Sequence, residues 1–176
     1  MEKLNIRGFE SLYNIILAQL EAKKLYGAER GFKYPSMSSE EVELQIAVLT
    51  NDKRTNEKIK SDLTRSEVKG LQYGNAAEFQ YHRTNGLTKL QSDQNTDVIL
   101  FRYHDKTYRD IDIDLILATD VEPLVESWVP DFHKTYANPA AKRYRKNMSN
   151  GFIENHKISL LKIRNGKIIN ETLDDH

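Results

Sequence analysis

The residues best placed for chemistry form an alternating acidic run, in which Asp110, Asp112 and Asp114 are separated by single isoleucines. Successive residues of a β-strand point to opposite faces, so these carboxylates would share one face and the aliphatic side chains the other. Neighbouring carboxylates would then lie ~7 Å apart, which is two residues of strand rise. Three like charges at this spacing require solvent, basic partners or a bound cation.

Bound divalent cations are one way to neutralise such a face. Two carboxylates on alternate residues of a strand can converge on a pair of ions ~4 Å apart, as in many phosphoryl-transfer sites. The sequence therefore predicts Asp112 and Asp114 as catalytic ligands of Mg²⁺, with Asp110 as an auxiliary catalytic acid. Asp-x-Asp pairs of this kind occur in nucleotidyltransferases and some nucleases, but no Gly-Ser turn to hold nucleotide phosphates precedes Asp110. A solvated or salt-bridged strand face and an interaction surface remain open alternatives.

The second candidate site is a basic run with one aromatic member, Lys142, Arg143, Tyr144, Arg145 and Lys146. Asn138-Pro139, just upstream, has the pattern of a helix start, so we expect the run to spread over about one and a half helical turns. Its cations could hold nucleic-acid phosphates, and Tyr144 could stack on a base. The alternative is an ordinary solvated helix face.

Charge is unevenly distributed along a chain whose net charge is zero. Residues 105–131 contain eight acidic and two basic residues, whereas residues 132–167 contain nine basic residues and one acid. Either the two segments neutralise each other within the fold, or they serve a charged partner. That partner would be a nucleic acid, another protein or a second copy of this chain.

Composition excludes several other chemistries. The chain contains no cysteine, which rules out disulfides, cysteine zinc sites and thiol catalysis. Its five histidines form no His-Glu-x-x-His motif, and no glycine-rich phosphate loop occurs. We therefore expect no cofactor other than Mg²⁺.

The length and hydropathy of the chain favour one compact domain over residues 1–176. No apolar run approaches the ~18 residues of a membrane span, and the N-terminus lacks the pattern of a signal peptide. We therefore expect a cytoplasmic protein with no membrane partner.

Helices are predicted in the first part of the chain, over residues 1–70. Phe9, Leu12, Ile16 and Leu20 recur at helical spacing, and Gly27 is placed to end that helix. Ser38 followed by Glu41 is a capping-box pattern that opens a second helix. A further helical piece would carry Ile59 and Leu63.

Strand patterns dominate residues 73–176. Alternation over 77–82 predicts a half-buried strand, and Asn85-Gly86 predicts a hairpin turn after it, followed by a polar loop over 91–96. Residues 98–101 are apolar on both faces, as in a central strand, and a two- or three-residue loop would join this strand to the aspartate strand. Asp120 would cap a short helix. Asn165-Gly166 would join a C-terminal hairpin.

Together these patterns predict an α+β fold, with N-terminal helices followed by a mainly antiparallel sheet and interspersed short helices. The functional expectation is an intracellular, nucleic-acid-associated protein with Mg²⁺-dependent phosphodiester or nucleotidyl-transfer chemistry. The alternative is a non-catalytic interaction module, such as a regulator, inhibitor or assembly factor. The sequence does not decide whether the protein is an enzyme.

Overall fold

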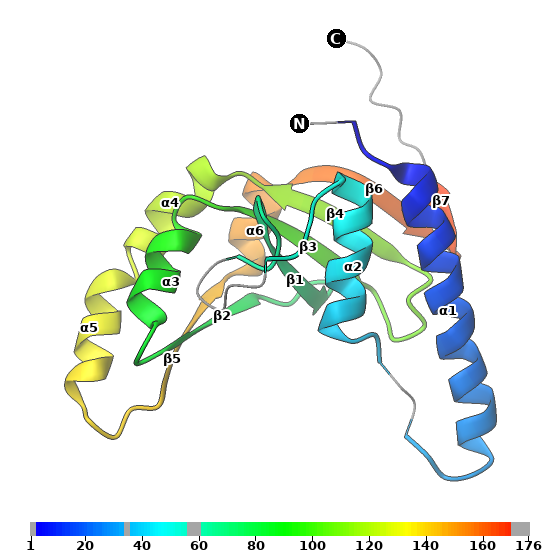
Figure 1. The fold of residues 1–176 in the computed structure, drawn as a ribbon, viewed down its shortest axis with the longest axis horizontal. Helices are drawn as coiled ribbons and strands as arrows, with labels where there is room; N and C mark the ends of the chain where they lie inside the picture. The colour runs from blue at the N-terminus through cyan, green and yellow to red at the C-terminus, as the bar shows by residue number, and fades with distance from the viewer. Residues whose placement is uncertain (1–2, 34–35, 56–60, 170–176) are drawn as a thin grey trace.

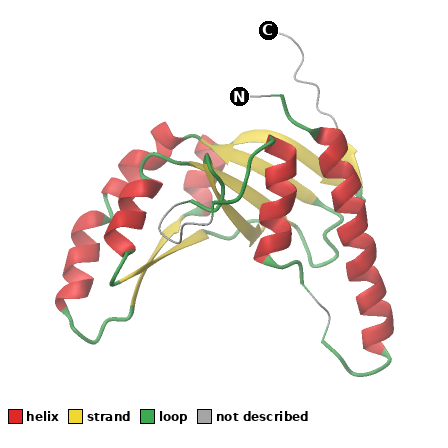
Figure 2. Cartoon of the chain, viewed as in Figure 1, coloured by secondary structure: helices red, strands yellow, loops and turns green. Residues whose placement is uncertain are grey.

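The computed structural model describes residues 3–33, 36–55 and 61–169, and it confirms the α+β class (Figures 1 and 2). Both predicted N-terminal helices are present, α1 (Ile6–Ala28) and α2 (Ser39–Thr50). The capping box forms as predicted: Ser38 Oγ accepts from the Glu41 amide, and Glu41 Oε2 accepts from the Ser38 amide. The third helical piece is not confirmed, because Ile59 lies outside the described residues and Leu63 makes an isolated β-bridge with Arg54.

A five-stranded sheet forms the centre of the molecule. Its spatial order is β1 (Ser66–Gln72), β3 (Asp97–Tyr103), β4 (Ile111–Ile116), β6 (Ile158–Arg164) and β7 (Lys167–Ile169). The pairing of β1 with β3 is parallel, and the other pairings are antiparallel. The boundary predicted near residue 70 was wrong, since β1 starts at Ser66. The charged Glu67 and Lys69 mask its strand pattern.

A separate two-stranded antiparallel sheet pairs β2 (Ala77–His82) with β5 (Arg143–Met148). The hairpin predicted at Asn85-Gly86 was therefore wrong, and these residues instead begin α3 (Gly86–Asp93), which also takes part of the predicted 91–96 loop. A Cβ on Gly86 would lie 2.8 Å from a ring carbon of Phe132, so this glycine permits close packing and does not form a hairpin turn.

Three further helices complete the fold, α4 (Ala118–Glu126), α5 (Val129–Ala137) and α6 (Asn150–His156). The residue that precedes α4 as its N-cap is Leu117, so the predicted Asp120 cap was wrong. The helix predicted from Asn138-Pro139 was also wrong, because β5 occupies that part of the chain. The C-terminal hairpin is confirmed: Asn165 and Gly166 both have positive φ, 53° and 75°, between β6 and β7.

The central sheet separates two hydrophobic cores. One face, with Ile99, Phe101 and Ile113, packs against α1 and α2. Part of the other face, with Val98, Leu100 and Ile116, packs against α3 to α6 and the inner side of the β2–β5 sheet. The remainder of this second face is polar, and the acidic residues of β4 lie there.

Candidate functional site

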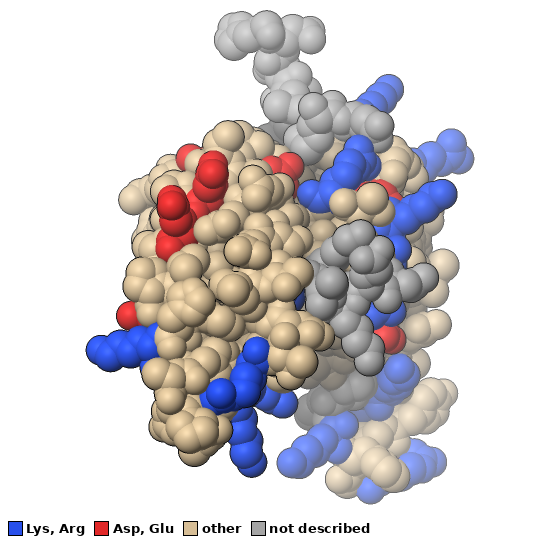
Figure 3. All heavy atoms as spheres, turned by 60° about the vertical axis from the view of Figure 1, so that its left-hand side comes forward, with Lys and Arg blue, Asp and Glu red and all other residues tan. Residues whose placement is uncertain are grey.

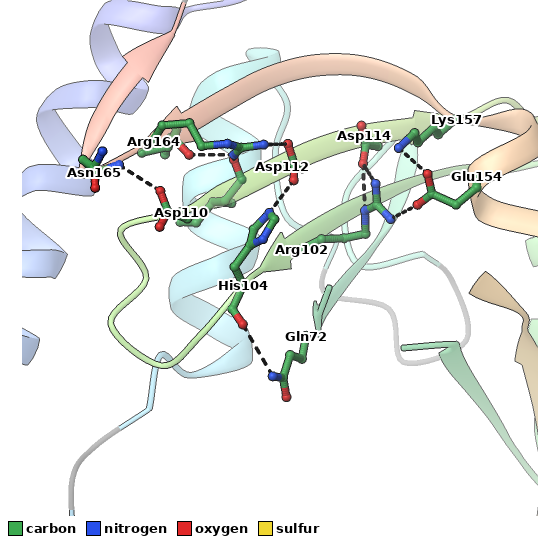
Figure 4. A network of polar contacts seen from close by, with 12 residues as sticks. Gln72, Arg102, His104, Asp110, Asp112, Asp114, Glu154, Lys157, Arg164 and Asn165 are labelled. Atoms are coloured by element: carbon green, nitrogen blue, oxygen red, sulfur yellow. Dashed lines mark hydrogen bonds and ion pairs between the residues drawn. The ribbon is translucent and has the colours of Figure 1, made fainter. Parts of the chain in front are cut away.

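The aspartate strand forms as predicted, with its carboxylates on one face and its aliphatic residues on the other. Asp112 and Asp114 are both buried, whereas Ile111, Ile113 and Leu115 point into the core beneath α1 and α2. Asp110 lies just before β4, and its carboxylate accepts a hydrogen bond from the Asn165 amide at 2.8 Å (Figure 4). The structure therefore brings together two of the three predicted catalytic acids and gives the third a different neighbourhood.

The loop between β3 and β4 is longer than predicted, and this changes the register. Seven residues, 104–110, separate the two strands, and the pairs are Arg102 with Asp112 and Leu100 with Asp114. Neither register predicted from a two- or three-residue loop is observed. The observed one places the guanidinium of Arg102 on the same face as the two carboxylates.

Arg102 is fully buried and joins three elements. Its Nε and Nη2 lie 2.8 and 2.6 Å from Asp114 Oδ2, and its Nη1 lies 2.5 Å from Glu154 Oε1 on α6. The ring of Tyr73 covers the guanidinium, with its centroid 4.5 Å from Cζ. Lys157 contacts the other oxygen of Glu154 at 2.5 Å. Asp114 thus belongs to an alternating chain of acidic and basic groups (Figure 4).

Asp112 has two partners of its own. Arg164 of β6 lies 2.6 Å from Asp112 Oδ1, and His104 Nε2 lies 2.7 Å from Oδ2. Arg164 also donates to the carbonyl of Ile111 at 3.0 Å, so it links β6 to β4 through side chain and backbone together. The His104 ring stacks on Tyr73 with centroids 4.4 Å apart.

The two buried carboxylates respond differently to these surroundings. Burial acts to raise the pKa of Asp112, but the hydrogen bonds with His104 and Arg164 outweigh it and hold that pKa below its ordinary value. Burial also raises the pKa of Asp114, and there Arg102 offsets the effect only in part. Each carboxylate nevertheless has a guanidinium in direct contact.

These contacts are the ones expected of a salt-bridged strand face. Within residues 3–33, 36–55 and 61–169, no three His, Asp or Glu side chains are grouped so that they could hold a metal ion. Binding of Mg²⁺ by Asp112 and Asp114 is a prediction from the sequence alone, and their ion pairs with Arg164 and Arg102 do not support it. An ion would have to displace or rearrange Arg164 and Arg102 to reach them.

The basic run lies on strand β5, so its side chains alternate between two faces. Arg143 and Arg145 are exposed on the outer side, and Lys142 is exposed just before the strand. Tyr144 points inward, where its hydroxyl donates to the Trp128 carbonyl at 2.9 Å. Lys146 pairs with Asp131 of α5 at 2.5 Å. Of the five predicted nucleic-acid contacts, the strand thus presents Arg143 and Arg145 together.

The outer side of this two-stranded sheet is a continuous polar surface, which we call the ribbon face. It consists of three cross-strand pairs, Glu78–Asn147, Gln80–Arg145 and His82–Arg143. Five of these residues are exposed and Gln80 is half-buried. In Figure 3, which brings the side with α3–α5 forward, Lys and Arg gather in the lower part and at the upper right, and Asp and Glu gather mainly at the upper left.

A second buried ionic cluster was missed in the sequence. Glu67 of β1 contacts Lys69 at 2.6 Å and Lys89 of α3 at 3.1 Å, and Lys89 also contacts Asp93 at 3.2 Å. The hydroxyl of Tyr81 donates to the other oxygen of Asp93 at 3.0 Å. These residues are far apart in sequence and have no shared motif. Only the Glu67-x-Lys69 and Lys89-x-x-x-Asp93 spacings could have signalled the local contacts.

No protein family and no curated protein matches the chain. Among the described helices, none combines the length and the apolar character needed to cross a membrane. The class of protein must therefore be argued from these surfaces.

The buried Arg102–Asp114 pair should be essential to stability when only one partner is removed. Arg102→Leu leaves a buried carboxylate without its cation, and we expect a loss of about 3–5 kcal/mol in the free energy of unfolding. The double variant Arg102→Leu/Asp114→Leu should recover most of that loss. Urea unfolding measures the free energy of unfolding of the single and the double variant. A double variant as unstable as Arg102→Leu would show that the unpaired Asp114 carboxylate is not the cause of the loss. Arg109→Leu, which removes an exposed pair with Glu21, should cost less than ~1 kcal/mol.

Thermal unfolding with Mg²⁺ tests the predicted metal site. An ion bound only by the folded protein raises Tm by mass action. Because Arg102 and Arg164 already neutralise the two carboxylates, we expect millimolar Mg²⁺ to leave Tm unchanged. A rise that persists in Asp110→Asn but is lost in Asp112→Asn and Asp114→Asn would instead establish the site.

The second ionic cluster predicts a pH dependence of stability. Burial raises the pKa of Asp93 to about 6, against the opposing effect of Lys89. The folded protein then binds this proton more tightly than the unfolded chain, so this contribution to stability falls as pH rises from about 4 through 6. The free energy of unfolding of the wild type should therefore fall relative to that of Asp93→Asn over this range. As a control, the free energy of unfolding of Glu122→Gln, which changes an exposed carboxylate, should follow that of the wild type in parallel over this pH range. If the curve of Asp93→Asn is also parallel to that of the wild type, the raised pKa of Asp93 is contradicted.

Proposed function

We propose that the chain is an intracellular nucleic-acid-binding protein and that the ribbon face is its binding surface. The observation that carries the proposal is the pair of outward guanidinium groups, Arg143 and Arg145, on alternate residues of β5. Phosphate recognition depends on such exposed cations, and arginine binds phosphate oxygens bidentately.

The charge of the ribbon face supports this proposal. Glu78 is its one acidic member, and it lies 3.6 Å from Arg145, with the two side chains 42% and 53% exposed. An ion pair this exposed contributes little, so Arg145 can exchange it for a phosphate contact at small cost. Lys142 extends the positive charge beyond the end of β5.

Binding is better supported than catalysis. Magnesium-dependent phosphodiester or nucleotidyl transfer at Asp112 and Asp114 would first have to release Asp114 from the fully buried Arg102 and Asp112 from the half-buried Arg164. The ribbon face needs no such rearrangement. The competing function is a non-catalytic protein-interaction module, in which the same arginines would pair with acidic side chains of a protein.

Salt dependence tests the proposed function. Each phosphate contact contributes about −0.9 to the slope of log K against log salt on duplex DNA, because counterions are released. Arg143→Gln/Arg145→Gln should therefore weaken binding and make that slope shallower by about 2. Fluorescence anisotropy with labelled mixed-sequence duplex and single-stranded oligonucleotides measures both quantities.

A matched control removes the same charge elsewhere. Arg7→Gln/Arg30→Gln changes two exposed arginines in and just after α1, and it should leave affinity and slope unchanged. If the wild type binds no oligonucleotide even at low salt, the protein-interaction function takes precedence.

A further inference from the structure

The ribbon face carries more chemical variety than phosphate binding requires. Lysine and arginine suffice to hold a backbone, yet this face also presents Gln80, Asn147, Glu78 and His82 in register with its arginines. Glutamine and asparagine can bind adenine bidentately, arginine can bind guanine, and glutamate can accept from cytosine. The composition therefore matches that of a surface that reads base edges.

The dimensions of the sheet fit one groove of one nucleic acid. Two paired strands lie ~4.8 Å apart, and a two-stranded ribbon enters the major groove of B-form DNA, which is ~12 Å wide. Successive same-face residues are ~7 Å apart along a strand, about two nucleotide steps of ~3.4 Å. Three cross-strand pairs are separated by two such intervals, ~14 Å or about four nucleotide steps, so they would cover about five base pairs. The major groove of A-form RNA is too deep and narrow for such entry.

The ribbon is held rigidly from behind. Phe79 and Tyr81 pack on Trp128 with ring centroids 5.5 and 6.5 Å apart, and Tyr144 packs edge-on against Phe132 at 5.6 Å. The hydroxyl of Tyr136 donates to the Tyr81 carbonyl at 2.6 Å. An inner face fixed by aromatic packing keeps the outer side chains in register, so little ordering cost remains on binding.

Arg83 fixes the entry into β5. Its guanidinium donates to the carbonyls of Asn138 and Ala141 at 2.5 and 3.4 Å and lies 5.0 Å from the Tyr136 ring centroid. It thereby holds the segment that leads from α5 to the exposed arginines. We assign Arg83 a positioning role, since its donors face the protein's own carbonyls.

We propose that the ribbon face binds duplex DNA in the major groove, where Gln80, opposite Arg145, and Asn147, the next outward residue after Arg145 on β5, read base edges beside the two arginines. This inference rests on the proposed function and narrows it to one substrate class. On the face itself, Gln80 Nε2 donates to Glu78 Oε1 at 2.5 Å, Arg143 donates to Gln80 Oε1 at 3.4 Å, and Arg145 lies 3.6 Å from Glu78. All three contacts are open to solvent, where such contacts contribute little, so a base edge or a phosphate can replace them.

Selection from a double-stranded DNA library with a randomised central segment tests this inference. The wild type should enrich a motif of about five base pairs and bind it more tightly than duplex RNA or single-stranded DNA of the same sequence. Gln80→Ala/Asn147→Ala should lose about 5- to 150-fold in affinity for that motif per bidentate contact, with an unchanged salt slope. Methyl green, which occupies the major groove, should compete, and the minor-groove ligand netropsin should not.

The control variant Asn14→Ala/Gln19→Ala removes two exposed amides from α1 and should retain the motif. Unfolding midpoints equal to that of the wild type would exclude loss of the fold. Absence of an enriched motif, equal affinity for duplex RNA, or retention of the motif by Gln80→Ala/Asn147→Ala would each overturn the inference while leaving nucleic-acid binding intact. Absence of binding to every oligonucleotide would instead remove the proposed function itself.

Discussion

A fully buried guanidinium has to be surrounded by acceptors, and Arg102 imposes that requirement on the whole central sheet. Its partners come from β4 and α6, so β3, β4 and α6 must dock in one arrangement for the charge to be compensated. A slip of one residue between β3 and β4 would turn Asp114 to the opposite face and leave Arg102 buried without it. Arg164 applies the same constraint between β6 and β4 through Asp112. With the strand register fixed in this way, the apolar residues of β3 and β4 are aligned to receive helices on both sides.

The opposed charges of the two chain segments are used in two different ways. Some of these charges form ion pairs within the fold, Asp112 with Arg164 and Asp131 with Lys146. Arg143 and Arg145 lie outside this internal neutralisation, because alternation along β5 turns them toward solvent. A sequence count of acids and bases cannot separate these two uses. The distinction depends on which face of each strand is covered.

Local signals predicted the parts of the fold that are built from local contacts. The capping box at Ser38, the apolar spacing of α1 and the Asn165-Gly166 turn are all satisfied within a few residues of chain. The wrong predictions concern places where the structure depends on contacts between segments that are far apart in the sequence. The Asn85-Gly86 pattern predicts a turn, whereas Phe132 requires the small size of Gly86, and the Asn138-Pro139 pattern predicts a helix where the basic run forms β5. The inward Tyr144 and Met148, alternating with Arg143, Arg145 and Asn147, were a readable strand signal. The pairings of Arg102 and of Glu67 had no sequence signal beyond the charges themselves.

The two strands of the ribbon come from widely separated parts of the chain, residues 77–82 and 143–148. The intervening segment contains two strands of the central sheet and three helices. Closing such a long loop is entropically costly, and pairings of high sequence separation form slowly. A nascent chain therefore has no ribbon face until residue 148 has emerged from the ribosome and β5 has docked on β2. The surface is thus a product of completed folding, and a truncated chain that ends before β5 would retain Gln80 and His82 without the arginines that face them.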